Sequence, residues 1–267
     1  MRSGVNRSGA IVHPTALLSR EAVIGAGCEI GPFCRIEGKV QIGPNCRFGT
    51  GVVIGTPPMD RSFQGEESGV VIGANNIFFE YVTIHRATGP DEMTVIGDNN
   101  YIMNYVHIAH NCSIGNNCTL TNGVQLGGYT QIGDGANLGG LVGVHQHCRI
   151  GKLTMVGAHS YVNRDILPFM LAAGNPCRVF GLNLIGLKRA GWDSDKIAEL
   201  EQAYRIIYRS NLTLAAALKK IEQELSQGPA KAEVQYLLEF CANSRRGVEL
   251  RSSPHPDNFA EGRMLNF

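Results

Sequence analysis

Apolar side chains recur at every sixth position over most of the chain. From residue 96 the series runs without a slip to residue 162, and its members are Ile96, Ile102, Ile108, Ile114, Leu120, Leu126, Ile132, Leu138, Val144, Ile150, Val156 and Val162. An amphipathic helix repeats its apolar face about every 3.6 residues and a half-buried strand about every 2, so neither element explains this period. Glycine follows the apolar residue at many steps, which is typical of a hexapeptide-repeat solenoid of short parallel strands.

Three six-residue steps make one triangular coil of such a solenoid. Residues 18 positions apart in the chain should therefore stack about one strand spacing, roughly 4.8 Å, from each other. We predict a mainly β protein, with a left-handed parallel β-helix over residues 1–181. Residues 56–71 and 86–95 each replace whole hexads. We expect them to project as two loops from one corner, either carrying binding groups or serving only as solvated turns.

The carboxyl third of the chain has a different pattern. Leucine, isoleucine and tyrosine lie three and four positions apart after residue 182, which predicts a C-terminal α-helical domain over residues 182–247. Helices are expected near residues 182–190, 194–208, 213–226 and 230–244. Asp193 or Ser194, and Thr213, are suitable N-caps. Residues 248–267 are polar and are expected to form a disordered tail or a strap on a neighbouring subunit.

Composition narrows the class of protein. The 267 residues have a formal net charge of +1, which gives no reason to expect a nucleic-acid partner. Six of the eight cysteines fall at the small-residue position of a hexad, so they are interpreted as core packing in a reducing compartment. The chain shows no signal peptide and no apolar run of about 18 residues. We therefore expect a cytoplasmic protein without a membrane span.

The densest polar cluster within the regular coils surrounds His110. The 18-residue rule stacks His110, Gly128 and Gln146 in one column, beside a column of Asn111, Tyr129 and His147. A histidine that can act as a base would then lie next to a glycine whose N–H could receive a developing oxyanion. This arrangement suits acyl transfer, although histidines that only face solvent are also common at solenoid corners.

Several short segments carry a family resemblance. They are GPFC (31–34), VTIHR (82–86), HIAHNC (107–112), VHQHC (144–148), GNP (174–176) and FGLNLIGLKRAG (180–191). In this order, within a match from Val12 to about Gly247, they resemble the UDP-N-acetylglucosamine O-acyltransferases of lipid A biosynthesis. The resemblance implies an enzyme that moves a 3-hydroxyacyl chain from acyl carrier protein to the 3-position of UDP-N-acetylglucosamine. It also implies a homotrimer that needs no cofactor or metal ion.

The resemblance further implies roles for individual residues. His110 matches the general base and Gly128 the backbone oxyanion donor. The positions that match substrate-binding residues are Asp60, His85, His107, His145, Gln146, Asn183 and Arg189. Asn183 and Arg189 match contacts that are made from a neighbouring subunit. Ala158 matches the position that closes the acyl groove, and together with His159 it implies a medium or slightly shortened chain.

The chain departs from the family pattern at charged positions. Asn111 stands where Asp usually follows the base, and Tyr129 where His usually follows the oxyanion glycine. Charged side chains are also replaced at Ser62, Ala190 and Ile185. These changes leave the identity of the acceptor sugar undetermined. A 3-amino-3-deoxy UDP-sugar, which would be acylated on nitrogen, is an alternative to UDP-N-acetylglucosamine.

Three other interpretations use the same fold. A γ-type carbonic anhydrase would bind zinc through three histidines, for which His107, His110 and His145 are candidates, but its spacing differs and it lacks the helical domain. The related N-acyltransferase of lipid A assembly would need an additional amino-terminal domain, whereas here the hexads begin by Val12. A catalytically silent trimeric scaffold is the third, and the retained His110, Gly128, Gln146 and Asp60 argue against it.

Overall fold

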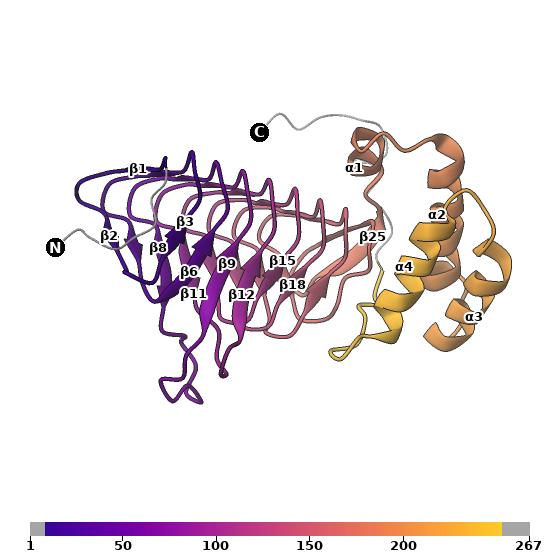
Figure 1. The fold of residues 1–267 in the computed structure, drawn as a ribbon. Helices are drawn as coiled ribbons and strands as arrows, with labels where there is room; N and C mark the ends of the chain where they lie inside the picture. Colours follow the sequence, from indigo (N-terminus) through magenta and orange to yellow (C-terminus); the bar gives the residue numbers. More distant parts are fainter. Residues whose placement is uncertain (1–8, 253–267) are drawn as a thin grey trace.

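The computed structural model describes residues 9–252 of the chain. These residues form a triangular coil of parallel strands that leads into a group of helices (Figure 1). The strands lie in three sheets, and from β1 to β23 each strand is hydrogen-bonded to the one three steps earlier or later in the chain. The predicted left-handed parallel β-helix is confirmed.

Each sheet forms one face of the triangular coil, and most strands have only two residues. The first sheet contains, in order, β1 (Ile11–Val12), β4 (Glu29–Ile30), β7 (Arg47–Phe48), β10 (Ile77–Phe78), β13 (Tyr101–Ile102), β16 (Thr119–Leu120), β19 (Asn137–Leu138), β22 (Met155–Val156), β24 (Met170–Ala173) and β25 (Arg178–Leu182). The second contains β2 (Leu17–Leu18), β5 (Arg35–Ile36), β8 (Val53–Thr56), β11 (Thr83–His85), β14 (His107–Ile108), β17 (Gln125–Leu126), β20 (Gly143–Val144) and β23 (Tyr161–Val162). The third contains β3 (Val23–Ile24), β6 (Lys39–Ile42), β9 (Gly69–Ile72), β12 (Met93–Ile96), β15 (Ser113–Ile114), β18 (Gln131–Ile132) and β21 (Arg149–Ile150).

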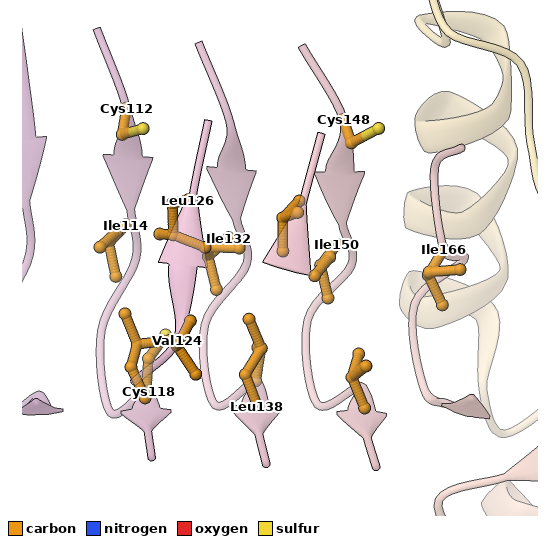
Figure 2. Close-up of a cluster of buried hydrophobic side chains, with 14 of the residues drawn as sticks. Cys112, Ile114, Cys118, Val124, Leu126, Ile132, Leu138, Cys148, Ile150 and Ile166 are labelled. Carbon is orange, nitrogen blue, oxygen red and sulfur yellow. The ribbon is translucent and has the colours of Figure 1, made fainter. Parts of the chain in front are cut away.

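The residues of the six-residue series fill the interior of the coil. Figure 2 shows Ile114, Ile132 and Ile150 in a row from left to right on successive strands of the third sheet, and Leu126 and Leu138 reach the same core from the other two sheets. The cysteines contribute to this packing. All eight are buried and unpaired, and several donate a weak Sγ–H bond to a glycine carbonyl of the next coil. Their interpretation as packing residues therefore agrees with the structure.

Both inserted loops project from the corner between the second and third sheets. We call this edge the loop corner; it consists of residues 57–68, 86–92, 109–112, 127–130 and 145–148. The loops hang from the lower edge of the coil in Figure 1. They are shorter than predicted, because β8 continues through Thr56 and the chain re-enters the third sheet already at Gly69 and Met93. There, Gly69 pairs with both Lys39 and Met93 in an extended ladder.

The end of the coil is closed by an antiparallel strand. β25 pairs with β24, and Leu182 lies opposite Met170. The predicted helical domain therefore begins too early: Leu182 is a buried strand residue, and the first helix starts only after Asn183, whose side chain accepts a hydrogen bond from the Gly186 N–H. The helices are α1 (Leu184–Arg189), α2 (Ser194–Arg209), α3 (Leu214–Leu225) and α4 (Lys231–Ala242). Asp193 and Thr213 are the N-caps of α2 and α3, as predicted.

The first residues of the predicted tail are ordered against the coil. Val248 is buried and forms a bridge with Asp165, while the Glu249 carbonyl accepts a hydrogen bond from the Tyr208 hydroxyl. The polar sequence predicts a tail from residue 248 onward, but backbone pairing holds residues 248–252 in place. The remainder, residues 253–267, lies outside the described residues. Within residues 9–252, no helix is long and apolar enough to cross a membrane.

Removal of one rung of the core should destabilise the coil. Leu138 is fully buried, whereas its neighbour in β19, Asn137, faces outward. We expect Leu138→Ala to lower the free energy of unfolding by about 2–5 kcal/mol, because it leaves a cavity in a close-packed core. Asn137→Ala is the matched control and should change it by less than about 0.5 kcal/mol. Urea denaturation followed by circular dichroism measures both, and equal losses would contradict this assignment of inner and outer faces.

Candidate active site

A cavity of about 430 Å³ opens beside the loop corner. Its lining comes from the second sheet, the loop corner and the tip of the first loop, and consists of Met59, His85, His107, Ala109, His110, Gln125, Leu126, Gly127, Gly128, Gly143, Val144, Gln146 and Tyr161. Five of the predicted site residues, namely His85, His107, His110, Gly128 and Gln146, therefore share one cavity. A sixth, Asp60, contacts the ring of His110 from the first loop.

The ring of His110 is held by the residue that follows it. His110 Nδ1 lies 2.9 Å from Asn111 Oδ1. The Asn111 amide is in turn fixed by Thr88 of the second loop, whose N–H donates to Oδ1 (2.8 Å) and whose carbonyl accepts from Nδ2 (3.0 Å). Asn111 adopts a left-handed conformation with φ of 57°, a conformation in which asparagine is among the better tolerated residues.

Asp60 approaches His110 from the opposite side of the ring. One carboxylate oxygen of Asp60, Oδ2, lies 3.9 Å from His110 Nε2. The other, Oδ1, accepts hydrogen bonds of 2.9 Å from both the N–H and the hydroxyl of Ser62. These bonds from Ser62, together with the nearby His110, lower the pKa of Asp60 below its ordinary value. Ser62 thus fixes the orientation of this carboxylate.

Gly128 lies directly against the imidazole. A Cβ atom at this position would come within 2.6 Å of His110 Cε1 and Nε2, so no larger residue fits without displacing the ring. The N–H of Gly128 makes no hydrogen bond within residues 9–252. The imidazole of His110 and an unoccupied backbone donor therefore lie next to each other, as the stacking rule predicts.

Two further histidines line the cavity on the second sheet. His107 Nδ1 lies 2.8 Å from the Thr83 hydroxyl, and His85 Nδ1 donates to the Pro57 carbonyl at 2.7 Å. Their rings meet edge to face with centroids 5.2 Å apart. Burial lowers the pKa of His107 to about 4, and the neighbouring histidines His85 and His110 add to this effect. His107 is therefore a neutral polar group near pH 7.

The remaining predicted site residues lie away from this cavity. His145 bonds through Nδ1 to the carbonyl of Gln146, and Asn183 caps α1. Arg189 is exposed at the end of that helix. Ala158 and His159 are exposed on the corner between the first and second sheets. Within one chain the structure does not bring these residues to His110.

Sequence reasoning missed several cavity residues. Gln125, Gly143 and Tyr161 stack above His107 on the second sheet, so the 18-residue rule applied to His107 would have identified them. Met59 reaches the cavity from the first loop, and no repeat pattern indicates its position. Among residues 9–252 of one chain, no three His, Cys, Asp or Glu side chains are grouped so that they could hold a metal ion.

Comparisons with known proteins match both parts of the chain. Residues 21–56 and 93–128 match the bacterial transferase hexapeptide model, and residues 165–249 match the model described as UDP-N-acetylglucosamine O-acyltransferase, domain 2. A curated relative from Thermodesulfovibrio yellowstonii, named as an acyl-(acyl-carrier-protein)–UDP-N-acetylglucosamine O-acyltransferase, is 44% identical over 252 residues, with 90% of this chain and 96% of the relative covered. A relative of the same name from Gloeothece citriformis is 47% identical, with 83% and 78% covered.

Solved structures give the same result. A UDP-N-acetylglucosamine acyltransferase from Bacteroides fragilis has a TM-score of 0.82 at 36% identity, with 89% of this chain and 99% of that chain covered. The enzyme from Campylobacter jejuni has a TM-score of 0.80 at 33% identity, with 91% and 98% covered. The identity and the coverage of these relatives extend over the coil, the loops and the helices together. The chain therefore belongs to the UDP-N-acetylglucosamine O-acyltransferase family.

Proposed function

We propose that this protein transfers a 3-hydroxyacyl chain from acyl carrier protein to the 3-position of UDP-N-acetylglucosamine, the first step of lipid A biosynthesis, with His110 as the general base. The observation that carries the proposal is the geometry around His110. Its Nδ1 is bonded to Asn111 while its Nε2 faces the cavity, beside the unoccupied N–H of Gly128. Base and oxyanion donor on adjacent coils are what direct acyl transfer requires.

The proposed reaction is a single displacement at the thioester. His110 Nε2 accepts the proton of the sugar 3-hydroxyl as the hydroxyl oxygen attacks the thioester carbon. The Gly128 N–H stabilises the negative charge on the thioester oxygen. The attack gives a tetrahedral intermediate. When this intermediate collapses, the carbon–sulfur bond breaks, and the thiolate of the carrier's prosthetic group takes the proton from Nε2. His110 ends in its starting state.

Neighbouring cavity residues supply binding contacts for the acceptor. In this proposal, Asp60 and Gln146 bind hydroxyl groups of the sugar, and His85 and His107 present polar ring edges to it. The depressed pKa of His107 favours this role, because a neutral imidazole can both donate and accept a hydrogen bond at pH 7. Gln125 and Tyr161, next to the apolar Met59 and Val144, line the same cavity and belong to the same binding surface.

We further propose that the working protein is a cytoplasmic homotrimer. Exposed apolar side chains follow the corner between the first and second sheets, at Phe33 (66% exposed), Tyr81 (50%), Tyr105 (61%) and Leu141 (58%). A stripe of exposed apolar side chains along one corner indicates a covered surface. In the proposed trimer, Ala158, His159, Asn183 and Arg189 of a neighbouring subunit lie near the cavity. Helices α1–α4 form a separate helical domain in each subunit. His145 lies beside Gln146 at the same edge, and the unpaired buried cysteines fit a reducing compartment.

Product analysis is the direct test of this function. The purified protein is incubated with UDP-N-acetylglucosamine, or its 3-amino analogue, and a mixture of 3-hydroxyacyl carrier proteins of different lengths, and the product is identified by mass spectrometry. An ester or an amide product identifies the acceptor, and its mass gives the acyl length. We expect His110→Ala to abolish transfer with the native mass of a trimer retained. Full activity of that variant would exclude His110 as the base, and no product with either sugar would favour a silent scaffold.

Gly128→Ala should inactivate the protein without unfolding it. The added methyl group would come within 2.6 Å of the His110 ring and force the imidazole away from the acceptor. We expect kcat/KM to fall by roughly 10²-fold or more, the range associated with a misplaced general base or oxyanion donor. Asn137→Ala, at a side chain that faces outward from the first sheet, is the control. Similar activity of the two variants would contradict the close approach of His110 and Gly128.

The low pKa of His107 should be visible in protein stability. Between pH 6.5 and about 4 the unfolded chain binds a proton at this residue that the folded chain does not. The stability that this neutral imidazole allows is therefore lost as the pH falls through that window. We expect His107→Gln to reduce the acid-induced loss, measured by urea denaturation at several pH values. His159→Gln, at an exposed histidine, is the control, and an unchanged pH dependence in His107→Gln would contradict the assignment.

A further inference from the structure

The catalytic histidine has two polar partners in this chain, and neither duplicates the other. We propose that orientation and charge are divided between them. Asn111, held by the backbone of Thr88, is a positioning residue that fixes the tautomer of His110, while Asp60 supplies the negative charge that stabilises the imidazolium. The inference rests on the proposed function of His110 as the base. It assigns a role to the second loop and gives Asp60 a role beyond sugar binding.

The orientation of the Asn111 amide is determined by Thr88. An amide oxygen must accept from the Thr88 N–H, and an amide NH₂ must donate to the Thr88 carbonyl, so the oxygen and nitrogen of Asn111 cannot be exchanged. The oxygen that accepts from Thr88 is the same atom that lies 2.9 Å from His110 Nδ1. Because this oxygen can only accept, Nδ1 must carry the proton.

The tautomer of His110 follows from this contact. With the proton on Nδ1, the neutral ring has its lone pair on Nε2, the nitrogen that faces the cavity. Asn111 therefore orients the base as effectively as a carboxylate would. As a neutral amide, however, it supplies no charge to stabilise the imidazolium that forms during the reaction.

The Thr88–Asn111 contact is rigid because both ends are anchored. The Asn111 N–H donates to the hydroxyl of Thr94, which is fully buried, at 2.9 Å. On the loop side, the Gly89 N–H donates to Glu66 of the first loop at 2.7 Å. The second loop is thus tied to both the coil and the first loop. Its position next to His110 is a consequence of the fold and not of substrate.

Asp60 is suited to supply the missing charge. Its Oδ1 is occupied by Ser62, which leaves Oδ2 directed at His110 Nε2, 3.9 Å away. The two side chains are only 12% and 22% exposed, for His110 and Asp60 respectively, so solvent screens their attraction incompletely. Within the described part of the chain, Asp60 is the one acidic side chain that lies within ion-pair distance of His110.

The other titratable groups around His110 do not provide this charge. His107 and His85 lie on the second sheet, and Tyr129 of the next coil meets the His110 ring edge to face with centroids 5.3 Å apart. Burial raises the pKa of Tyr129, so it stays neutral near pH 7. A nearby carboxylate stabilises the positive charge of a protonated imidazole. Once Nε2 has taken the acceptor's proton, its N–H points toward Asp60 until the leaving thiolate removes the proton.

The pH dependence of kcat/KM separates the two roles. We compare Asp60→Asn, Asn111→Asp and the double variant with the unaltered protein, using the acceptor identified by product analysis. Removing the carboxylate at residue 60 should move the acidic limb about one pH unit lower, and adding one at residue 111 should move it about one unit higher. In the double variant the charge is relocated to the Nδ1 side, and the limb should return toward its original position with part of the lost activity restored.

Asn117→Asp is the matched control for the added charge. Asn117 has the same φ of 57° as Asn111, but it lies on the corner between the third and first sheets, away from the cavity. It should leave the limb where it is. An acidic limb that Asp60→Asn does not move, or a double variant no better than Asp60→Asn, would overturn the role of Asp60, since a purely structural or sugar-binding residue predicts no rescue.

A second measurement tests the tautomer without any substrate. In the ¹⁵N spectrum of the full chain with labelled histidine, the His110 signals are those that disappear in His110→Ala. We expect the Nδ1–H tautomer in the unaltered protein and a mixture in Asn111→Ala. The Nε2–H tautomer in the unaltered protein would refute the role of Asn111. Because this result does not depend on turnover, failure of the proposed function and failure of this inference remain distinguishable.

Discussion

Parallel hydrogen bonding between residues 18 positions apart is the interaction on which the rest of the molecule depends. It places Ile30 opposite Phe48 and Ile108 opposite Leu126, so one aliphatic ladder fills the interior and every corner lies directly above the corner before it. A single turn of such a coil could not bury its apolar face alone, and stacking many turns produces the core. The same regularity brings together corner residues that are distant in the chain.

The proposed active site lies where this regular corner is interrupted. Two loops leave the coil at the loop corner, in the turns just before the one that contains His110. The coil supplies the parts that need accurate spacing, which are the imidazole and the backbone of Gly128. The loops supply the parts that contact the imidazole from outside the stack, namely Thr88 through Asn111 and the carboxylate of Asp60. The hydrogen bond from the Gly89 N–H to the Glu66 carboxylate joins the second loop to the first.

The sequence was informative wherever the period of six applied. It predicted the coil, its buried cysteines and the neighbouring positions of His110 and Gly128, because each follows from a fixed register. It gave no access to the Thr88–Asn111 contact or to the Ser62 turn that aims Asp60, since loop conformations depend on individual hydrogen bonds and not on a repeat. The predicted start of the helical domain at residue 182 was too early for a similar reason. Leu182 belongs to β25, an antiparallel strand that extends the first sheet and that no local pattern indicates.

Division of orientation and charge between two residues has a structural cause. A carboxylate at residue 111 could still accept a hydrogen bond from the Thr88 N–H, but it would lose the bond that the Asn111 NH₂ now donates to the Thr88 carbonyl. With the second loop in its present place, an amide is therefore the side chain that satisfies both backbone groups of Thr88. The charge must then come from another element, and Asp60 is placed to provide it from the acceptor side. In this proposal, the stabilisation of protonated His110 depends on the conformation of the first loop, in which Ser62 orients the Asp60 carboxylate.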